Sequence, residues 1–290
     1  MTHRPRRAWA AARKAVLLVL LTALAVVISL PFFWNVTASF KPLDEIQADR
    51  WIPRNWQPEN YLVVLGLRTP PGFGAKALNI SFGRWYFNSL FIAAWVTLLQ
   101  VTTSAMAAFA FSRLTWPGRD KLFFLYLGTL MIPGLVVAIP NFGLMFKLGF
   151  YNSYSGLIVP GAFTAFGTFM LRQFMLGIPR SLDEAAEIDG AGPLRVFLDV
   201  ILPLTTPGVL TLAIFIFLGN WGSFFWPLIM IKDEHLRTLP IGMLVFNSSY
   251  SSQTNLLMAG SLLNTLPVLV LFIALQRFVV RGIQLGAVKG

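Results

Sequence analysis

The residues with the clearest functional spacing lie in a short polar segment, 179–203, which separates two very apolar stretches. Ser181 and Glu184 have the S-x-x-E spacing of a capping box, in which the serine caps a helix and the glutamate reaches back to the cap amide. A compact, capped helix in a loop between apolar stretches indicates that something docks there. The chemistry that this segment predicts is therefore recognition of a partner rather than bond cleavage.

The residues that follow predict a helix, a tight turn and a second helix. Ala185, Ala186 and Glu187 favour a helix, and Gly190 stands where a left-handed glycine would end it. Pro193 suits the first turn of the next helix. Each residue also has a purely local reason for its place, namely capping, helix propensity or turn geometry. Only the whole unit indicates docking, because small side chains let a partner approach closely.

The residue types that catalysis requires are scarce. The chain has no Cys, which excludes disulfides, thiol catalysis and thiolate metal sites, and its two His residues stand at positions 3 and 235. An intramembrane enzyme would lack a plausible set of catalytic groups. No segment matches the phosphate-binding pattern G-x-x-x-x-G-K-[ST], so ATP chemistry must come from another chain. We expect no catalytic residue, no cofactor and no metal.

A second set of candidates consists of polar and aromatic residues within the apolar stretches. An unpaired amide is costly in a bilayer, so such groups face a bundle interior, where they line a pathway or bond neighbouring helices. Bonding between helices is the more common role, as packing is for the aromatic residues. The candidates for a translocation path are Asn141, Asn220, Trp221, Ser223, Phe224 and Asn264, with Asn88 and Gln100 as further polar positions.

The composition places these segments in a membrane protein. Of the 290 residues, 56% are hydrophobic and only 12% are charged, whereas about a quarter of a soluble domain is charged. The net charge of +11 comes from basic residues that flank apolar stretches. It therefore indicates membrane topology and contact with anionic lipid headgroups rather than binding to nucleic acid.

Charge-free runs of about 20 residues or more can cross a bilayer as helices. The sequence predicts six such spans, hence an all-α membrane protein, with breaks or kinks at Pro133, Pro140, Pro160 and Pro207. The runs are 15–40, 85–112, 122–146, 148–171, 200–231 and 238–276; the last holds a polar external segment, 247–255, before its span at 256–276.

The distribution of Lys and Arg favours cytoplasmic N- and C-termini, with segment 179–203 on the inner side. The predicted organisation is a cytoplasmic segment 1–14, a permease domain 15–281 and a cytoplasmic tail 282–290. The long external loop 41–84 is rich in Pro and Trp. We expect it to be a lid or a partner contact rather than a domain with its own core.

The segment resembles the EAA loop of binding-protein-dependent ABC importer permeases: Glu184-Ala-Ala, then Gly190, then Val200-x-Leu202-Pro203. The resemblance continues along the chain and is closest to the smaller permease of the carbohydrate, maltose-type branch. One departure is Gly222, which stands after Trp221 where that branch usually has Asn. The other matching segments are 39–42, 59–61, 88–90, 111–120, 131–133, 152–158 and 286–290.

The resemblance implies a type I importer fold with a cytoplasmic coupling helix, in the plasma membrane of a bacterium. It implies a second permease subunit, two ATPase subunits and an external solute-binding protein, which contacts loops 41–84 and 247–255. By that resemblance the tail residues Gly286, Lys289 and Gly290 approach the ATPase. The residues implied to couple to the ATPase are Glu184, Ala185, Ala186, Asp189, Gly190, Leu202 and Pro203.

Two alternatives remain beside a sugar importer. The same machine could carry a glycerol-phosphate, an osmolyte or an amino acid. A stand-alone secondary transporter would need buried charges for ion coupling, and the six runs contain none.

Overall fold

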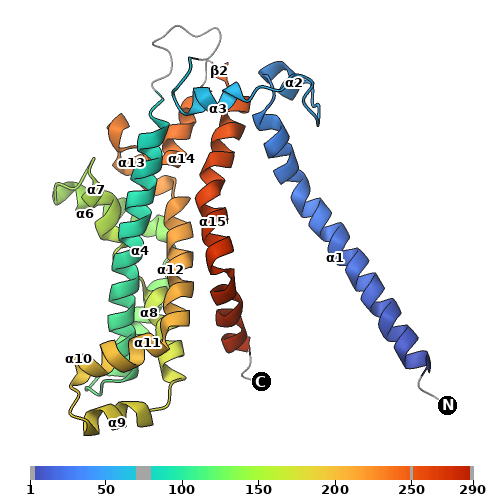
Figure 1. Ribbon diagram of the computed structural model, residues 1–290. Coiled ribbons are helices and arrows are strands. Elements are labelled where there is room, and N and C mark those ends of the chain that lie inside the picture. The colour runs from blue at the N-terminus through green and yellow to red at the C-terminus, as the bar shows by residue number, and fades with distance from the viewer. Residues whose placement is uncertain (1–3, 70–79, 249–250, 288–290) are drawn as a thin grey trace. The chain divides into compact units, whose positions relative to one another are not determined.

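A computed structural model of the chain describes residues 4–69, 80–248 and 251–287, whose regular elements are helices and two short strands joined by turns (Figure 1). The chain forms two compact units, Met1–Ile80 with Met243–Thr265, and Ser81–Gly242 with Leu266–Gly290. The two units are described separately.

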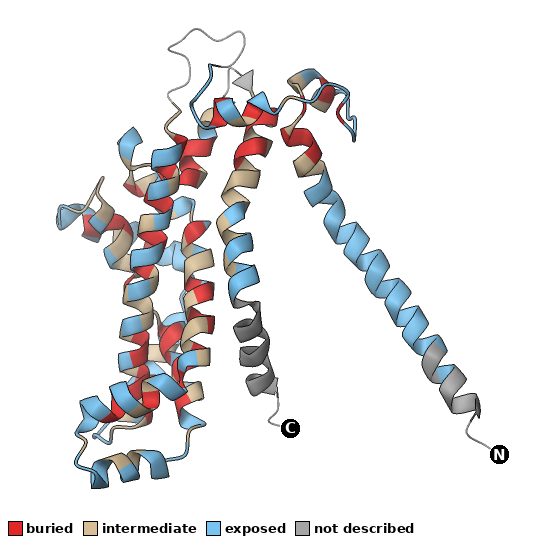
Figure 2. Cartoon of the chain, viewed as in Figure 1, coloured by how far each residue is buried: buried red, intermediate tan, exposed pale blue. Residues whose placement is uncertain are grey.

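The first unit begins with α1 (Arg4–Ser39), a long apolar helix. Its stretch Ala12–Ser39 is apolar enough to cross a membrane, and none of its most apolar window is buried within the chain (Figure 2). The unit also contains α2 (Leu43–Gln47), α3 (Glu59–Val64), the 3₁₀ helix η5 (Met243–Phe246), strands β1 (Asn247–Ser248) and β2 (Ser251–Ser252), and the start of α15 (Thr254–Ala287). β1 and β2 pair antiparallel, the one departure from an all-helical fold in the described residues.

Two buried charges organise the segment that follows α1. The Lys41 ammonium is fully buried, lies 4.1 Å from the Trp34 ring centre and donates to the backbone carbonyls of Arg50 and Trp51. Burial lowers the Lys41 pKa from its ordinary value, and the nearby Glu45 carboxylate opposes that shift. This segment therefore has a small polar core of its own. The sequence predicts a lid or a partner contact without a core.

Asn60 ties this polar core to the start of α15. Its side-chain amide donates to the carbonyls of Ser39 and Lys41, both at 2.9 Å. Its carbonyl oxygen accepts a hydrogen bond from Asn255 at 3.1 Å. Asn255 belongs to the polar segment expected to be external, and part of that segment is thus buried within this unit.

The second unit is built around α4 (Phe82–Ser112), an unbroken helix of 31 residues. Helices α8 (Ala165–Leu176) and α12 (Thr206–Trp221) pack along it, and α9 and α10 lie near one end of it (Figure 1). Small residues at the interfaces allow close approach, as is usual between membrane helices. The fully buried core side chains include Val96, Leu171, Met175, Ile201, Leu212 and Met230.

Three of the predicted spans are pairs of helices that meet at a bend, so the described residues hold three straight candidate spans, or up to six if each pair counts as one. The pairs are α5–η1 with α6 (99°), α7–η2 with α8 (42°), and α10–η3–α11 with α12 (76°). Their bounds are α5 Arg119–Gly128, η1 Thr129–Met131, α6 Gly134–Lys147, α7 Tyr154–Ile158, η2 Val159–Gly161, α10 Pro193–Arg195, η3 Val196–Ile201 and α11 Leu202–Leu204.

The run boundaries differ from the helix ends where the backbone turns. Residues 148–153, expected to begin a span, form a turn in which Gly149 and Asn152 have positive φ, and the helix starts only at Tyr154. The run 200–231 divides into the end of η3, α11, α12, α13 (Phe225–Met230) and the links between them. The 3₁₀ helix η4 (Glu234–Leu236) and α14 (Leu239–Gly242) complete the unit.

Candidate coupling surface and translocation site

The helix α9 (Ser181–Ile188) of the second unit is largely exposed. None of its residues is buried, and Ile188 keeps 86% of its surface exposed. Asp183 and Ala186 are its half-buried residues, and Ala186 packs against the core of the unit. The opposite face, with Leu182, Ala185 and Ile188, is open. An apolar face open in the isolated chain fits contact with another protein.

The predicted capping box is not formed. The N-cap residue is Arg180, with no side-chain cap, and Ser181 is already the first helical residue. The amide of Glu184 donates to the carbonyl of Arg180 at 3.1 Å. Arg180 has helical backbone angles directly after Pro179, so the first turn starts one residue early and the serine cannot cap it. Asp183 and Glu184 instead place acidic groups in the first turn, which the helix dipole favours.

The end of α9 confirms the predicted glycine turn. Gly190 has φ +83°, its amide donates to Glu187, and the amide of Ala191 donates to the carbonyl of Ala186. This pair of bonds is a Schellman motif. Pro193 begins α10, as predicted. The turn between the helices is therefore fixed by backbone bonds.

The first turn of α9 is tied to α4 by a salt bridge that sequence reasoning missed. Arg113, the C-cap of α4, donates to the Asp183 carboxylate at 2.9 Å, and the two side chains are only 4% and 14% exposed. The same guanidinium donates to the carbonyls of Met175 and Ile178, at the end of α8. The one sequence signal is an arginine directly after a long apolar run.

The other predicted coupling residues lie on or beside these elements. Glu184, Ala185, Asp189 and Gly190 are exposed on α9 and its turn. Leu202 and Pro203 form α11 after η3, which is a π-helix, and Leu202 packs against the core. Of the tail, Gly286 lies in α15, while Lys289 and Gly290 are outside the described residues.

Two of the translocation candidates share a cavity. Asn220 and Ser223 line a space of about 20 Å³, together with Ser89, Leu157, Trp226 and Thr238 among others. A space of this size holds about one water molecule and no sugar. The Thr238 hydroxyl is buried without a hydrogen-bond partner among the described residues, and Asn220 donates to the carbonyl of Ile216 at 2.8 Å.

The remaining candidates lie elsewhere. Trp221 is 2% exposed and packs against Tyr86 and Phe217, so its ring is covered by its own chain. Phe224 is 41% exposed, and Asn141 lies half-buried in α6. Asn264 belongs to the first unit. Asn141, Trp221 and Phe224 do not line the cavity that Asn220 and Ser223 share.

The polar position Asn88 has a structural role that the spacing alone did not show. It is fully buried in α4, donates to the carbonyls of His235 and Arg237 at 2.8 Å, and accepts from the Tyr154 hydroxyl at 2.7 Å. Asn152, with positive φ, likewise accepts from the amides of Lys232 and Asp233. Both side chains provide hydrogen-bond partners for backbone groups of residues 232–237, which lie outside any regular α-helix.

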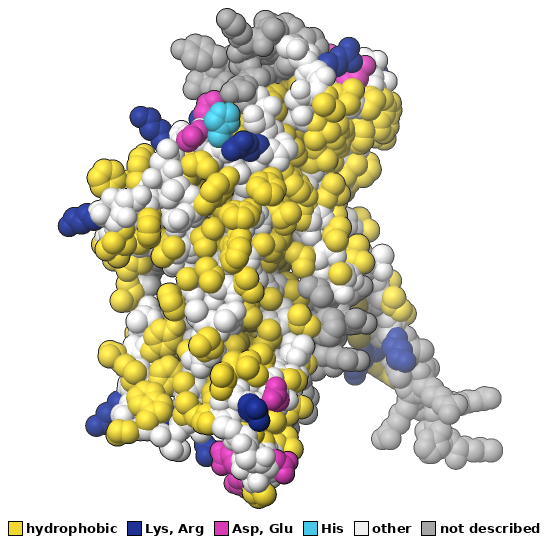
Figure 3. Space-filling view, turned by 60° about the vertical axis from the view of Figure 1, so that its left-hand side comes forward, with side chains coloured by type: hydrophobic (Ala, Val, Ile, Leu, Met, Phe, Trp, Pro, Cys, Tyr) yellow, Lys and Arg dark blue, Asp and Glu magenta, His cyan; other side chains and the backbone are white. Residues whose placement is uncertain are grey.

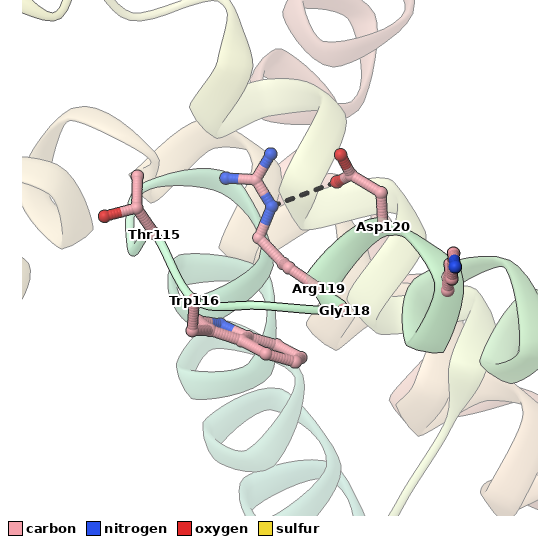
Figure 4. Close-up of a pocket in the computed structure, with 6 residues that line it drawn as sticks. Thr115, Trp116, Gly118, Arg119 and Asp120 are labelled. Atoms are coloured by element: carbon pink, nitrogen blue, oxygen red, sulfur yellow. Dashed lines mark hydrogen bonds and ion pairs between the residues drawn. The ribbon is translucent and has the colours of Figure 1, made fainter.

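A wider, open pocket of about 350 Å³ lies in the turn between α4 and α5 (Figure 4). Trp116, Gly118 and Lys121 line it, and Arg119 and Asp120 form an ion pair at 3.0 Å within it. Elsewhere hydrophobic side chains cover much of the visible surface, with charged side chains in separate groups (Figure 3). No group of three or more His, Cys, Asp or Glu residues in the described part of the chain could hold a metal ion.

Residues 100–283, which include α9, its glycine turn and α12, match the binding-protein-dependent transport system inner membrane components. The chain belongs to this family. The permease is thus a multi-pass membrane protein and a transport subunit, not an enzyme.

The permease is also similar over most of its length to curated relatives. It is 32% identical to the probable ABC transporter permease protein YurM of Bacillus subtilis, over 99% of this chain and 92% of the relative. It is 31% identical to the arabinooligosaccharides transport system permease protein AraQ of Halalkalibacterium halodurans, over 90% and 91%. It is 31% identical to the trehalose/maltose transport system permease protein MalG of Thermococcus litoralis, over 96% and 98%.

The fold of the permease matches that of a solved chain. The match is to a bacterial ABC transporter involved in the import of the acidic polysaccharide alginate, with a TM-score of 0.77. It covers 96% of this chain and 98% of that chain at 21% identity, which establishes the shared fold.

Proposed function

We propose that this permease is one transmembrane subunit of an ATP-driven importer that moves a sugar delivered by an external binding protein. It works with a second permease subunit and two ATPase subunits, in the plasma membrane of a bacterium. Both termini and the coupling segment 179–203 face the cytoplasm. The loops at 41–84 and 247–255 face the binding protein.

The observation that carries this proposal is the exposed helix α9 with its fixed turn. Ile188 and Leu182 present apolar surface without a partner in the described chain, and the Schellman motif at Gly190 holds the helix rigid. A rigid exposed helix transmits displacement better than a loose loop. Because the sequence has no phosphate-binding loop, the ATPase on which α9 acts is a separate chain.

The proposed cargo rests on the relatives. Among the relatives are permeases named for arabinooligosaccharides and for trehalose/maltose. A second candidate cargo is sn-glycerol-3-phosphate, after a Pectobacterium atrosepticum permease that is 34% identical over 72% of this chain.

The coupling role is tested by two substitutions at Gly190. A Cβ added there would meet no atom within 4 Å, so a larger side chain points into open space, where the ATPase would dock. We expect Gly190→Trp to insert normally but to lose uptake and its coupling to ATP hydrolysis. Gly190→Asn is the matched control, because Asn tolerates a left-handed backbone better than other residues with a Cβ. Normal uptake by Gly190→Trp would contradict the proposal.

The cargo is tested by ATP hydrolysis in the purified complex. With its binding protein present, the complex is offered a panel of di- and oligosaccharides, and sn-glycerol-3-phosphate. Stimulation by one or more neutral sugars supports the sugar importer. Stimulation by the phosphate ester alone would favour the second candidate.

A further inference from the structure

Hydrogen bonds join the inner end of α4 to α8 and to α9. Some are donated by α4 and others are accepted by it. Arg113 donates to Asp183 in α9 and to the carbonyls of Met175 and Ile178 at the end of α8. The ion pair is almost fully buried, so separating it would leave a charge in an apolar environment. The first turn of α9 therefore cannot shift away from α4 without a large cost.

Two further arginines, outside α4, donate hydrogen bonds to the same end of α4. Arg172 in α8 donates to the carbonyl of Phe111 at 3.1 Å, and Arg180 donates to that of Ser112 at 3.5 Å. These carbonyls belong to the last turn of α4, whose acceptors have no partner within the helix. Together with Arg113 they join α4, α8 and α9 at one end of the unit.

The other end of α4 is bonded to the segment 235–239. Asn88 donates to the carbonyls of His235 and Arg237, and Arg84 donates to His235 at 3.0 Å. The hydroxyl of Ser89 accepts from the amide of Leu239 at 2.8 Å. The first two turns of α4 thus hold this segment by several hydrogen bonds, and both Asn88 and Ser89 are buried.

Between these two ends α4 is continuous. It has no proline and no break over 31 residues, whereas three helix pairs of the same chain are bent by 42° to 99°. From Asn88 to Arg113 it spans roughly 38 Å at 1.5 Å per residue. A displacement at one end must therefore reach the other end as movement of a rigid body, while the bent pairs can absorb it.

We infer that α4 is the rod that couples α9 to the segment 235–239, with Arg113 and Asn88 as its positioning residues. The inference rests on the proposed contact between α9 and the ATPase. A nucleotide-driven movement of α9 is passed through the Arg113–Asp183 pair to α4, and through Asn88 to the segment at the far end. The same bonds carry movement in the reverse direction when a binding protein docks there.

The test follows the far end of the rod while the nucleotide is changed. Because the chain has no Cys, Glu234→Cys provides a single thiol beside the segment, at a position whose side chain is 54% exposed. The assembled complex is reconstituted in proteoliposomes and treated with a membrane-impermeant thiol reagent, with and without ATP and vanadate. We expect trapping to change the rate of thiol modification at least about fivefold.

The rod variants should remove this nucleotide dependence. Arg113→Gln breaks the inner attachment, and Asn88→Leu, of similar volume, breaks the outer one; each should assemble and hydrolyse ATP but show equal rates with and without trapping. Arg119→Gln is the matched control, because Arg119 is an arginine of the adjacent turn whose ion pair is more exposed. It should keep the full change.

The outcomes separate this inference from the proposed function. A full nucleotide-dependent change in Arg113→Gln or Asn88→Leu overturns the rod. No change in the parent complex also overturns it, provided that Gly190→Trp still uncouples ATP hydrolysis from uptake. If Gly190→Trp has no effect, the proposed function itself fails. Where Arg113→Gln does not assemble, Asp183→Asn weakens the same inner attachment; where Asn88→Leu does not assemble, Ser89→Ala removes the bond from α4 to Leu239. Retention of the full change in these variants counts against the rod.

Discussion

The packing of α8 on α4 depends on Gly167, and replacing this residue should lower the free energy of unfolding by a measurable amount. A Cβ at Gly167 would lie 2.5 Å from the Ser104 hydroxyl oxygen, 2.7 Å from Thr164 Cγ2 and 3.1 Å from Leu212 Cδ2. Ser104 and Leu212 are buried, so neither can turn into solvent. Gly167→Ala must therefore separate the helices or force side chains from their preferred rotamers, which costs about 1–3 kcal/mol.

A second glycine serves as an internal reference. Gly143 lies in the interior of α6, and a Cβ there would meet no atom within 4 Å. Both substitutions gain up to about 1 kcal/mol of helix propensity, so this gain cancels when the two variants are compared. The difference between them reports the overpacking alone. We expect Gly167→Ala to be less stable than Gly143→Ala by about 1–3 kcal/mol.

Thermal unfolding in detergent, followed by tryptophan fluorescence, measures this difference. At about 2–4 °C per kcal/mol for a chain of this size, the two melting temperatures should differ by roughly 2–12 °C. Adding Ser104→Ala to Gly167→Ala should recover part of the loss, because the Ser104 hydroxyl is the closest obstacle and has no hydrogen-bond partner among the described residues, while Thr164 and Leu212 remain. Equal melting temperatures for the two single variants would refute the reasoning.

Three further outcomes are expected. The chain purified without partners should neither bind nor hydrolyse ATP; hydrolysis by the isolated chain would contradict the division of labour. Deleting residues 282–290 should lower uptake while membrane insertion, checked by protease protection, is unchanged; full uptake would remove the tail from the mechanism. Asn60→Ala should lower the stability of the first unit by about 1–3 kcal/mol because it leaves buried acceptors unpaired; the loss should appear as a lower melting temperature, while the exposed Asn55→Ala should not change it.

The places of the predicted spans, three of which are bent helix pairs, and the helix–turn–helix of segment 179–203 follow from local signals. Apolar runs set the helices, and Gly190 ends α9 through its own backbone preference. The predicted start of α9 is wrong by one residue because Arg180 adopts helical backbone angles. Its side chain donates to the end of α4, a tertiary contact that the local sequence does not show. Pro133, Pro160 and Pro207 lie at the breaks as predicted, whereas Pro140 lies inside α6, where the helix continues past it. The 99° and 42° angles depend on packing that local sequence does not encode.

The breaks also explain why polar residues in apolar runs are difficult to interpret from sequence. A broken helix frees backbone amides and carbonyls, which cannot stay unpaired in a membrane. Asn88 and Asn152 satisfy such groups around residues 232–237, and Arg113 satisfies those at the end of α8. Asn88 and Asn152 are polar residues within apolar runs, as a pathway residue would be, but each bonds the backbone of another segment. Only polar side chains that do not bond the backbone groups freed at these breaks can bind a cargo. Which side chains those are depends on contacts between segments distant in the sequence.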